Sequence, residues 1–389
     1  MLARNFQLYL VFAAVFMIMV GFGIVMPLLP FFTRELGGSS FDMGMLVTVW
    51  ALAQVITAPR WGAFSDRVGR RPTIIVGLLG TAFAFLLIGL STSLWMLYVA
   101  RTLGGFISAA TIPSAYAYVA DVTPPERRST MMGQMGAMFG LGFMLGPTIG
   151  AVMAPLGISR AFFAAALFAL LTVVLIYFLL KEPENRTASA GGESRILQRL
   201  LVAVKKPYAS LMWISLLIAF AGSVLLSVMA FFLIDRFDAQ EAQVGLVFTL
   251  NAATGVFTQG VLIVLLVKKW GEVRTLRVGM ICGMVGFLLF SFSPSMWILI
   301  MMAVLQSIGQ SLGRPLCISL LSRTTDMGQG TTMGLQSSFE ALGRVVGPLW
   351  AGWLYQYSIQ APFLSAAAAF FLGIIMVIQV QALVSRTPP

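Results

Sequence analysis

The chain turns sharply at Gly62-Ala-Phe-Ser-Asp66-Arg67-Val-Gly69-Arg70-Arg71-Pro72, a short basic segment between the apolar stretches 42–63 and 72–91. The glycines permit a tight turn and let the flanking helices approach closely. The arginines hold the turn at the membrane surface, and Asp66 is available to an arginine or to the N-terminus of a neighbouring helix. The segment therefore predicts a hairpin of two membrane-spanning helices.

Apolar runs recur on both sides of this hairpin, out to the ends of the chain. The 389-residue sequence is 59% hydrophobic and only 10% charged, which leaves too little polar surface to cover a water-soluble protein. Runs of about 20 apolar residues are long enough to cross a bilayer as helices, so we predict an all-α polytopic membrane protein with twelve transmembrane helices. The expected spans are 6–33, 42–63, 72–91, 94–120, 130–154, 160–180, 208–234, 243–267, 275–292, 296–321, 331–355 and 361–384.

The net charge of +11 could suggest a nucleic-acid partner, but its distribution along the chain indicates otherwise. When Arg60, Arg160 and Arg277 at the span edges are counted with the adjacent loops, 19 of the 25 Lys and Arg residues fall on one side of the predicted membrane, three on the other and three within spans. An excess of basic residues marks the cytoplasmic side of a membrane protein. We therefore expect both termini in the cytoplasm and no binding of nucleic acid.

The residue types that are missing narrow the function further. There is no histidine, which excludes histidine-based relays, catalytic triads and histidine-ligated metal sites. There is also no cluster of acids and no phosphate-binding loop, so we expect neither an enzyme nor a bound cofactor or metal. Cys282 and Cys317 lie in apolar stretches and are expected to be core residues. The N-terminal apolar run continues past 20 residues without a cleavage site, so we expect a retained first span.

One long polar segment, 181–207, divides the predicted spans into six and six. We expect an N-terminal half at 1–180, a cytoplasmic linker at 181–207 and a C-terminal half at 208–389. An apolar stripe in the linker fits an amphipathic helix lying on the membrane surface, and a solvated linker is the alternative. The stripe consists of Ile196, Leu197, Leu200, Leu201 and Val204.

The two halves show a weak internal repeat. A shift of 201 residues superposes the stretch 130–133 on 331–334 and Gly146-Pro147 on Gly347-Pro348. The fifth span therefore corresponds to the eleventh, as expected for two parallel six-helix repeats. In this register two aromatic residues of the fifth span, Phe139 and Phe143, are replaced by Glu340 and Arg344 in the eleventh.

Three further motifs lie in the first half. The fourth span places Arg101 before Gly104-Gly105, although this arginine could also extend to the membrane interface. The fifth span has glycines four residues apart between Gly136 and Gly150, which let another helix approach, and the first span reads Gly23-Ile-Val-Met-Pro27-Leu-Leu-Pro30. Together with the 62–72 turn, these motifs resemble the signatures of the major facilitator superfamily, in particular its twelve-span drug:proton antiporter branch.

The resemblance implies two pseudo-symmetric six-helix halves around a central cavity, and export driven by the proton gradient through alternating access. It implies a small-molecule substrate, protons and the lipid bilayer as partners, in a bacterial cytoplasmic membrane, and we expect a monomer. It implies a gating loop of Gly62, Asp66, Arg67, Gly69, Arg70 and Arg71, and an antiporter motif of Gly136, Gly140, Gly142, Gly146, Pro147 and Gly150. In this family the loop aspartate lies near the start of the eleventh span, so Asp66 is the expected latch.

The chain also departs from the exporters that it resembles. Tetracycline exporters carry acids in the membrane portions of spans 1, 3 and 9, and here these spans have none. Quinolone-type exporters carry acids in spans 7 and 10, where this chain has Leu226 and Ser311. Glu340 is the one acid left deep within a predicted span, and a carboxylate at that depth is costly and usually marks function.

We therefore expect Glu340 to be the proton-coupling carboxylate. It can pair with Arg314 on the preceding span or with Arg344 one turn further along its own helix. A change of neighbour between inward- and outward-facing states would change its affinity for a proton. The alternative is a permanent structural ion pair. The expected coupling group is Glu340, Arg344, Arg314 and Arg101.

Deep within the predicted spans there are three arginines, Arg101, Arg314 and Arg344, but only one glutamate, Glu340. This excess of positive charge favours anionic, zwitterionic or metal-chelating substrates over monovalent cations. The first expectation is an exporter of small amphipathic drugs. The alternatives are a dedicated exporter of an endogenous metabolite, such as a siderophore, and a lipid-linked flippase. Each expected cavity residue could equally be a helix contact, and these residues are Gln54, Phe139, Phe231, Asn251, Gln259, Gln306, Gln310, Gln336 and Phe339.

Overall fold

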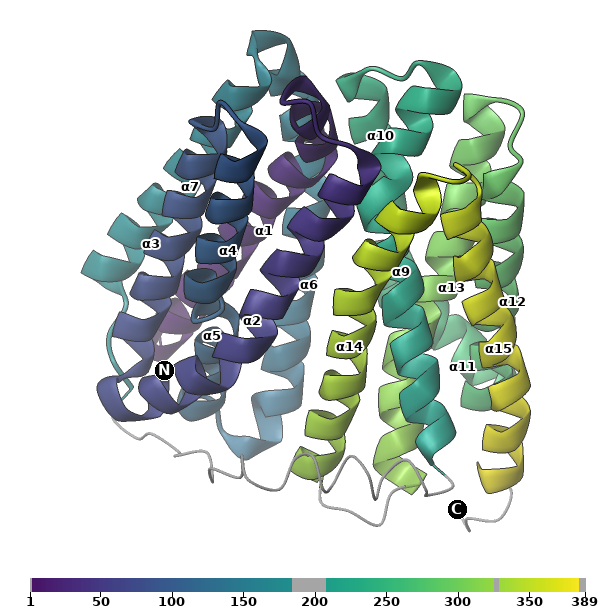
Figure 1. Ribbon diagram of the computed structural model, residues 1–389. Helices are drawn as coiled ribbons and strands as arrows, with labels where there is room; N and C mark the ends of the chain where they lie inside the picture. Colours follow the sequence, from purple (N-terminus) through teal and green to yellow (C-terminus); the bar gives the residue numbers. More distant parts are fainter. Residues whose placement is uncertain (1, 184–207, 325–328, 385–389) are drawn as a thin grey trace. The chain divides into compact units, whose positions relative to one another are not determined.

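The computed structural model describes residues 2–183, 208–324 and 329–384, and within these ranges every regular element is a helix (Figure 1). The predicted amphipathic helix at 196–204 lies outside the described residues. Elsewhere the structure places one helix, or two or three consecutive helical segments, at each of the twelve predicted spans. The all-α prediction is therefore confirmed for the part of the chain that the structure describes.

The helices begin and end within a few residues of the predicted limits. The first seven are α1 (Leu2–Glu35), α2 (Ser40–Val68), α3 (Arg70–Gly89), α4 (Leu94–Ser108), α5 (Thr111–Val122), α6 (Pro125–Met153) and α7 (Ile158–Leu179), with a short turn η1 (Ala154–Leu156) before α7. The others are α9 (Ala209–Phe237), α10 (Glu241–Phe257), the π-helical segment η3 (Thr258–Leu262), α11 (Ile263–Trp270), α12 (Glu272–Ser291), α13 (Met296–Thr324), α14 (Gln329–Tyr355) and α15 (Ala361–Val384).

Ten helical stretches among the described residues are long and apolar enough to cross a bilayer. The helices at the other two predicted spans are either too short or not apolar enough to be counted among these ten. The span at 94–120 is divided at Ala109–Ala110 into the short helices α4 and α5. The span at 331–355 belongs to α14, in which Gln336, Glu340 and Arg344 interrupt the apolar sequence.

The contacts of the chain define two compact units. The first contains Met1–Asp42, Val49–Gly191 and Ala239–Thr249, and the second contains Met43–Thr48, Gly192–Asp238 and Leu250–Pro389. Residues 43–48 of α2 and residues 241–249 of α10 thus belong to a different unit from the rest of their own helices. The division of the chain at the 181–207 linker stays a prediction.

The first unit is built around α1, which packs against α6 and α7. Its core joins residues of α1, α3, α5 and α6, including Val11, Ile74, Tyr118 and Met135, all of which are almost fully buried. Of the candidate spans among the described residues, α1 has the largest buried share, which agrees with its central place.

Small residues bring α1 and α6 into direct backbone contact. A Cβ atom on Gly23 would lie 2.8 Å from the Cα of Gly146 and 2.9 Å from the Cδ of Pro147. On the same face of α6, a Cβ on Gly142 would lie 2.8 Å from the Cβ of Met19. In the antiporter motif, Gly142 and Gly146 therefore contact α1, whereas Gly136 has no atom within 4 Å of the position of its Cβ.

The second unit repeats this contact between α9 and α14. A Cβ on Gly343 would lie 2.8 Å from the backbone nitrogen of Phe220, and one on Gly347 would lie 2.8 Å from the carbonyl oxygen of the same residue. Ser223 donates a hydrogen bond of 3.1 Å to the Gly343 carbonyl. Gly343 and Gly347 stand 201 positions after Gly142 and Gly146, so the register of the sequence repeat matches a repeated helix contact.

Gly146→Ala is expected to destabilise the first unit, because the added methyl group would meet backbone atoms of α1 that cannot move aside. Overpacking of this kind costs about 1–3 kcal/mol. Gly136→Ala, on the same helix, adds the same methyl group to open space and should be neutral or slightly stabilising. Thermal melting in detergent compares the two variants, and equal melting temperatures would contradict the assigned contact.

Candidate functional site

The loop between α2 and α3 is tied down by a glutamate from far along the chain. Glu182 accepts hydrogen bonds from the backbone N–H groups of Arg70, at 2.7 Å, and of Arg71, at 2.9 Å. It thereby satisfies the open N-terminus of α3 with a negative charge. Gly69 has a φ of 134°, and a Cβ there would lie 2.8 Å from Glu182. Glycine is therefore required at this turn.

Arg70 connects three helices beneath this loop. Its side chain is only 3% exposed and donates to Asp121 at the end of α5, with the Nε 2.9 Å from the Oδ2. It also pairs with Asp66 one turn earlier and donates to Ser65 at 3.2 Å. The arginine that holds Asp66 is therefore Arg70, whereas no sequence motif predicted the roles of Asp121 and Glu182.

The other loop residues make fewer contacts. The Arg71 guanidinium donates to the Tyr177 carbonyl and lies 5.6 Å from the centre of the Tyr177 ring. Arg67 is exposed, and Gly62 has no atom near the position of its Cβ. The expected contact of Asp66 with the start of α14 concerns both units and stays a prediction.

Arg101 on α4 is fully buried inside the first unit. None of its three guanidinium nitrogens has a hydrogen-bond partner among the described residues. Its nearest identified contact is the Trp50 ring of α2, whose centre lies 5.1 Å from the guanidinium carbon. A charged side chain buried with a cation–π contact alone is costly, which sets Arg101 apart from an ordinary packing residue.

The second unit holds the predicted carboxylate between two arginines. The Oε1 of Glu340 lies 3.1 Å from the Nε of Arg314 on α13, and its Oε2 lies 3.4 Å from the Nη1 of Arg344 on α14. The two pairings proposed from the sequence as alternatives therefore occur together. The side chain of Glu340 is 5% exposed, whereas those of Arg314 and Arg344 are 63% and 51% exposed.

Polar groups of three helices complete the surroundings of Glu340. Gln336 donates to Glu340 at 3.5 Å and to Ser215 of α9 at 3.2 Å. The buried thiol of Cys317 on α13 lies beside Ser215 and Glu340. The cluster of Arg314, Glu340, Arg344, Gln336 and Ser215 is called the carboxylate cluster below.

The expected cavity residues are placed in three groups. Phe231, Gln306, Gln336 and Phe339 are buried within the second unit, where Phe339 packs edge-to-face on Trp213 with ring centres 5.1 Å apart. Gln54, Asn251 and Gln310 are partly buried, and Phe139 and Gln259 are exposed. Gln306 is fully buried, and its amide has no hydrogen-bond partner among the described residues. A role for these side chains in substrate binding stays a prediction.

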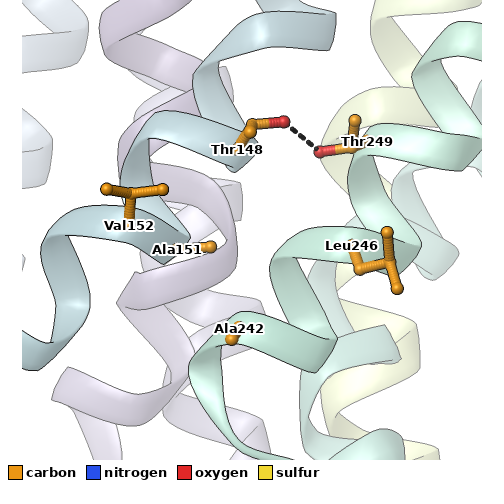
Figure 2. A pocket seen from close by; sticks show the side chains of 6 residues that line it. All are labelled: Thr148, Ala151, Val152, Ala242, Leu246 and Thr249. Carbon is orange, nitrogen blue, oxygen red and sulfur yellow. Dashed lines mark hydrogen bonds between the residues drawn. The ribbon is translucent and has the colours of Figure 1, made fainter.

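A small pocket lies in the first unit between α6 and the beginning of α10 (Figure 2). The hydroxyl groups of Thr148 and Thr249 hydrogen-bond across it at 2.9 Å, as the dashed line in Figure 2 marks. Its volume of about 210 Å³ is below the range for sites that hold drug-sized ligands, and its lining carries no charged group. The lining residues are Thr148, Ala151, Val152, Ala242, Leu246 and Thr249.

Comparison with known proteins identifies the family. The model of the Major Facilitator Superfamily matches residues 11–238 and 211–389, so the chain belongs to this superfamily of transporters. The chain is 30% identical to Multidrug resistance protein 1 of Bacillus subtilis (strain 168) over 383 residues, 97% of each chain. It is 25% identical to the quinolone resistance protein NorA of Staphylococcus aureus over 375 residues, 96% of each chain.

A solved structure agrees with this assignment. The crystal structure of the human organic anion transporter MFSD10 superposes with a TM-score of 0.72 and 25% identity, covering 96% of this chain and 99% of that one. The chain is therefore a multi-pass membrane transporter with the superfamily fold, and the expectation that it is not an enzyme is confirmed by its family.

Asp121→Asn is expected to lower the stability of the fold around the loop between α2 and α3, because it removes a negative charge that neutralises the buried Arg70. Breaking a buried ion pair costs about 3–5 kcal/mol, and since Asp66 still pairs with Arg70 we expect the lower end of that range. Glu272→Gln is the control, because Glu272 pairs at 3.4 Å with Arg323, whose side chain is 72% exposed. The melting temperature of Asp121→Asn should fall well below that of Glu272→Gln, and a larger fall in the control would refute the assignment.

Proposed function

We propose that the chain is a proton-coupled secondary active exporter of small drug-like compounds that works by alternating access. Its relatives in Bacillus and Staphylococcus are named for multidrug and quinolone resistance, and the chain aligns with them over nearly its whole length. The observation that carries proton coupling is the placement of Glu340, a buried carboxylate held by two arginines inside an apolar helix unit.

Coupling follows from what a proton would change in the carboxylate cluster. An ionised Glu340 holds Arg314 and Arg344 by charge-assisted bonds, whereas a protonated Glu340 releases both. If inward- and outward-facing states hold the arginines differently, they bind the proton with different affinity, and proton binding shifts the balance between them. The proton gradient then supplies the driving force, and no cofactor is needed.

Other predicted residues take supporting roles in this proposal. Arg101 is a second buried charge whose compensation can change between states. Arg70, with its partners Asp66 and Asp121, forms the cytoplasmic gate in this proposal. Asp66 is the latch that protonation of Glu340 must release. Gly142, Gly146, Gly150 and Pro147 hold α6 against α1.

The setting of the transporter is also part of the proposal. The distribution of basic residues in the sequence favours a bacterial cytoplasmic membrane with both termini in the cytoplasm. The partners are the substrate, protons and the surrounding lipid, the chain acts as a monomer of two six-helix halves, and it binds no nucleic acid.

A dedicated exporter of an endogenous metabolite, or a lipid-linked flippase, is the second candidate function. The observation that favours it is the excess of arginine at the carboxylate cluster, which suits a negatively charged group better than a lipophilic cation. The name of MFSD10, an organic anion transporter, points in the same direction. Drug susceptibility of a deletion strain, compared with its secretion of metabolites, separates the two functions.

Glu340→Gln tests proton coupling directly, because the amide keeps the shape of the side chain but cannot ionise. In proteoliposomes with an imposed pH gradient, we expect gradient-driven export of a fluorescent drug substrate to fall to background in Glu340→Gln. Substrate exchange without a gradient should persist at saturating substrate concentration, since no net proton movement is required.

Glu272→Gln is the matched control, because it removes a carboxylate that lies outside the carboxylate cluster and pairs with an exposed arginine. Its gradient-driven export should stay at the level of the unaltered protein. Unchanged gradient-driven export in Glu340→Gln would show that Glu340 is a structural ion pair instead.

A further inference from the structure

The carboxylate cluster carries more positive than negative charge. Arg314 and Arg344 share the single carboxylate of Glu340, which gives a formal charge of +1. α14 packs on α9, α13 and α15. The groups that face Glu340 from these elements and from α14 itself are Ser215, Arg314, Cys317, Gln336 and Arg344, and α15 has no ionisable residue in its sequence. Within the described part of this unit, nothing else offsets the second arginine.

The two arginines of the carboxylate cluster are exposed and have unused hydrogen-bond donors, whereas the Glu340 carboxylate is buried. A guanidinium has five N–H donors, and each of these two arginines uses one nitrogen to reach Glu340. More than half of each arginine side chain is exposed, against 5% for Glu340. A ligand therefore meets the guanidinium groups first, and reaches the carboxylate only after they have turned toward the ligand.

The charge balance excludes two simple kinds of exchanged substrate. A monovalent cation would meet two positive groups before it reached Glu340. A simple anion would pair with the arginines, but protonation of Glu340 frees both arginines and would strengthen that binding. The proton and the anion would then bind together, whereas exchange of one for the other requires each to weaken the binding of the other.

We infer that the substrates of this site are zwitterions, small molecules that carry an acidic and a basic group close together, and this inference rests on the proposed proton-coupled export. The acid of the substrate takes the place of Glu340 on Arg314 and Arg344, where paired N–H donors fit a carboxylate. The amine of the substrate takes the place of the arginines on Glu340. The ion pairs exchange partners, and the formal charge of the cluster stays at +1.

This exchange makes the proton and the substrate competitors. The amine needs an ionised Glu340, so a proton on that carboxylate removes its partner. Since the bonded atoms lie 3.1 and 3.4 Å apart, the acid and the amine must be near neighbours in the substrate to reach both partners at once. A compound that lacks either group leaves one charge of the cluster without its partner.

The test compares three ligands with the same aromatic ring on the purified full-length chain in detergent. Naphthylalanine carries both charged groups, naphthylethylamine only the cation, and naphthylpropanoate only the anion. We expect naphthylalanine to bind at least about tenfold more tightly than either of the others in isothermal titration calorimetry near neutral pH. Its affinity should fall as the pH is lowered toward protonation of Glu340, while that of naphthylpropanoate should rise.

Two variants locate the effect in the carboxylate cluster. In Glu340→Gln, naphthylalanine should bind no more tightly than naphthylpropanoate does. In Arg344→Gln, the affinity for naphthylalanine should fall, while the affinity for naphthylethylamine should rise. Arg323→Gln, which alters an exposed arginine also on α13, should change none of the three affinities. The comparison of ligands on the unaltered protein decides the question even if a variant does not fold.

Other outcomes overturn the inference. Equal or tighter binding of naphthylpropanoate identifies a simple anion site, equal or tighter binding of naphthylethylamine a cation site, and no binding of naphthylalanine at millimolar concentration excludes the assigned class. If Glu340→Gln abolishes gradient-driven export but the ligands show no preference for the zwitterion, the proposed function stands and only this inference fails.

Discussion

The proposed transport site depends on a single costly interaction, the burial of the Glu340 carboxylate inside a unit of apolar helices. An ionised carboxylate away from water is stable only when charged donors surround it, and here Arg314 and Arg344 do so from two different helices. Replacing the pair by apolar residues would often be neutral or stabilising, so stability alone does not account for it. The interaction therefore supports the proposed role in transport, in a chain whose relatives are named for multidrug and quinolone resistance.

The comparison of the two units shows how the site is set into the fold. In both units a helix with glycines four residues apart packs closely on the first helix of its half, through Gly142 and Gly146 in one and Gly343 and Gly347 in the other. The helix contact is thus repeated in both units, but the side chain about one turn before the first of these glycines, Gly142 or Gly343, differs. Where the first unit has Phe139, the second has Glu340.

The sequence predicted the features that arise from local patterns. Apolar runs of membrane length located the helices at the twelve predicted spans, and the acid within an apolar run pointed to Glu340. Contacts between distant segments could not be predicted, because nothing near residues 69–71 indicates that Glu182 closes the turn from more than 110 positions away. The glycine spacing predicted a helix contact but not its face, since the side of α6 that meets α1 depends on packing.

The central claim is that Glu340 gains and loses a proton as the substrate binds and leaves. Infrared difference spectroscopy of the purified protein measures this directly, through the carbonyl stretch of a protonated carboxylic acid. The account predicts that a transported substrate removes such a band at a pH where Glu340 is protonated, and that the change is absent in Glu340→Gln. The same band change in Glu340→Gln, or no carboxylic acid band at any pH in the unaltered protein, would contradict it.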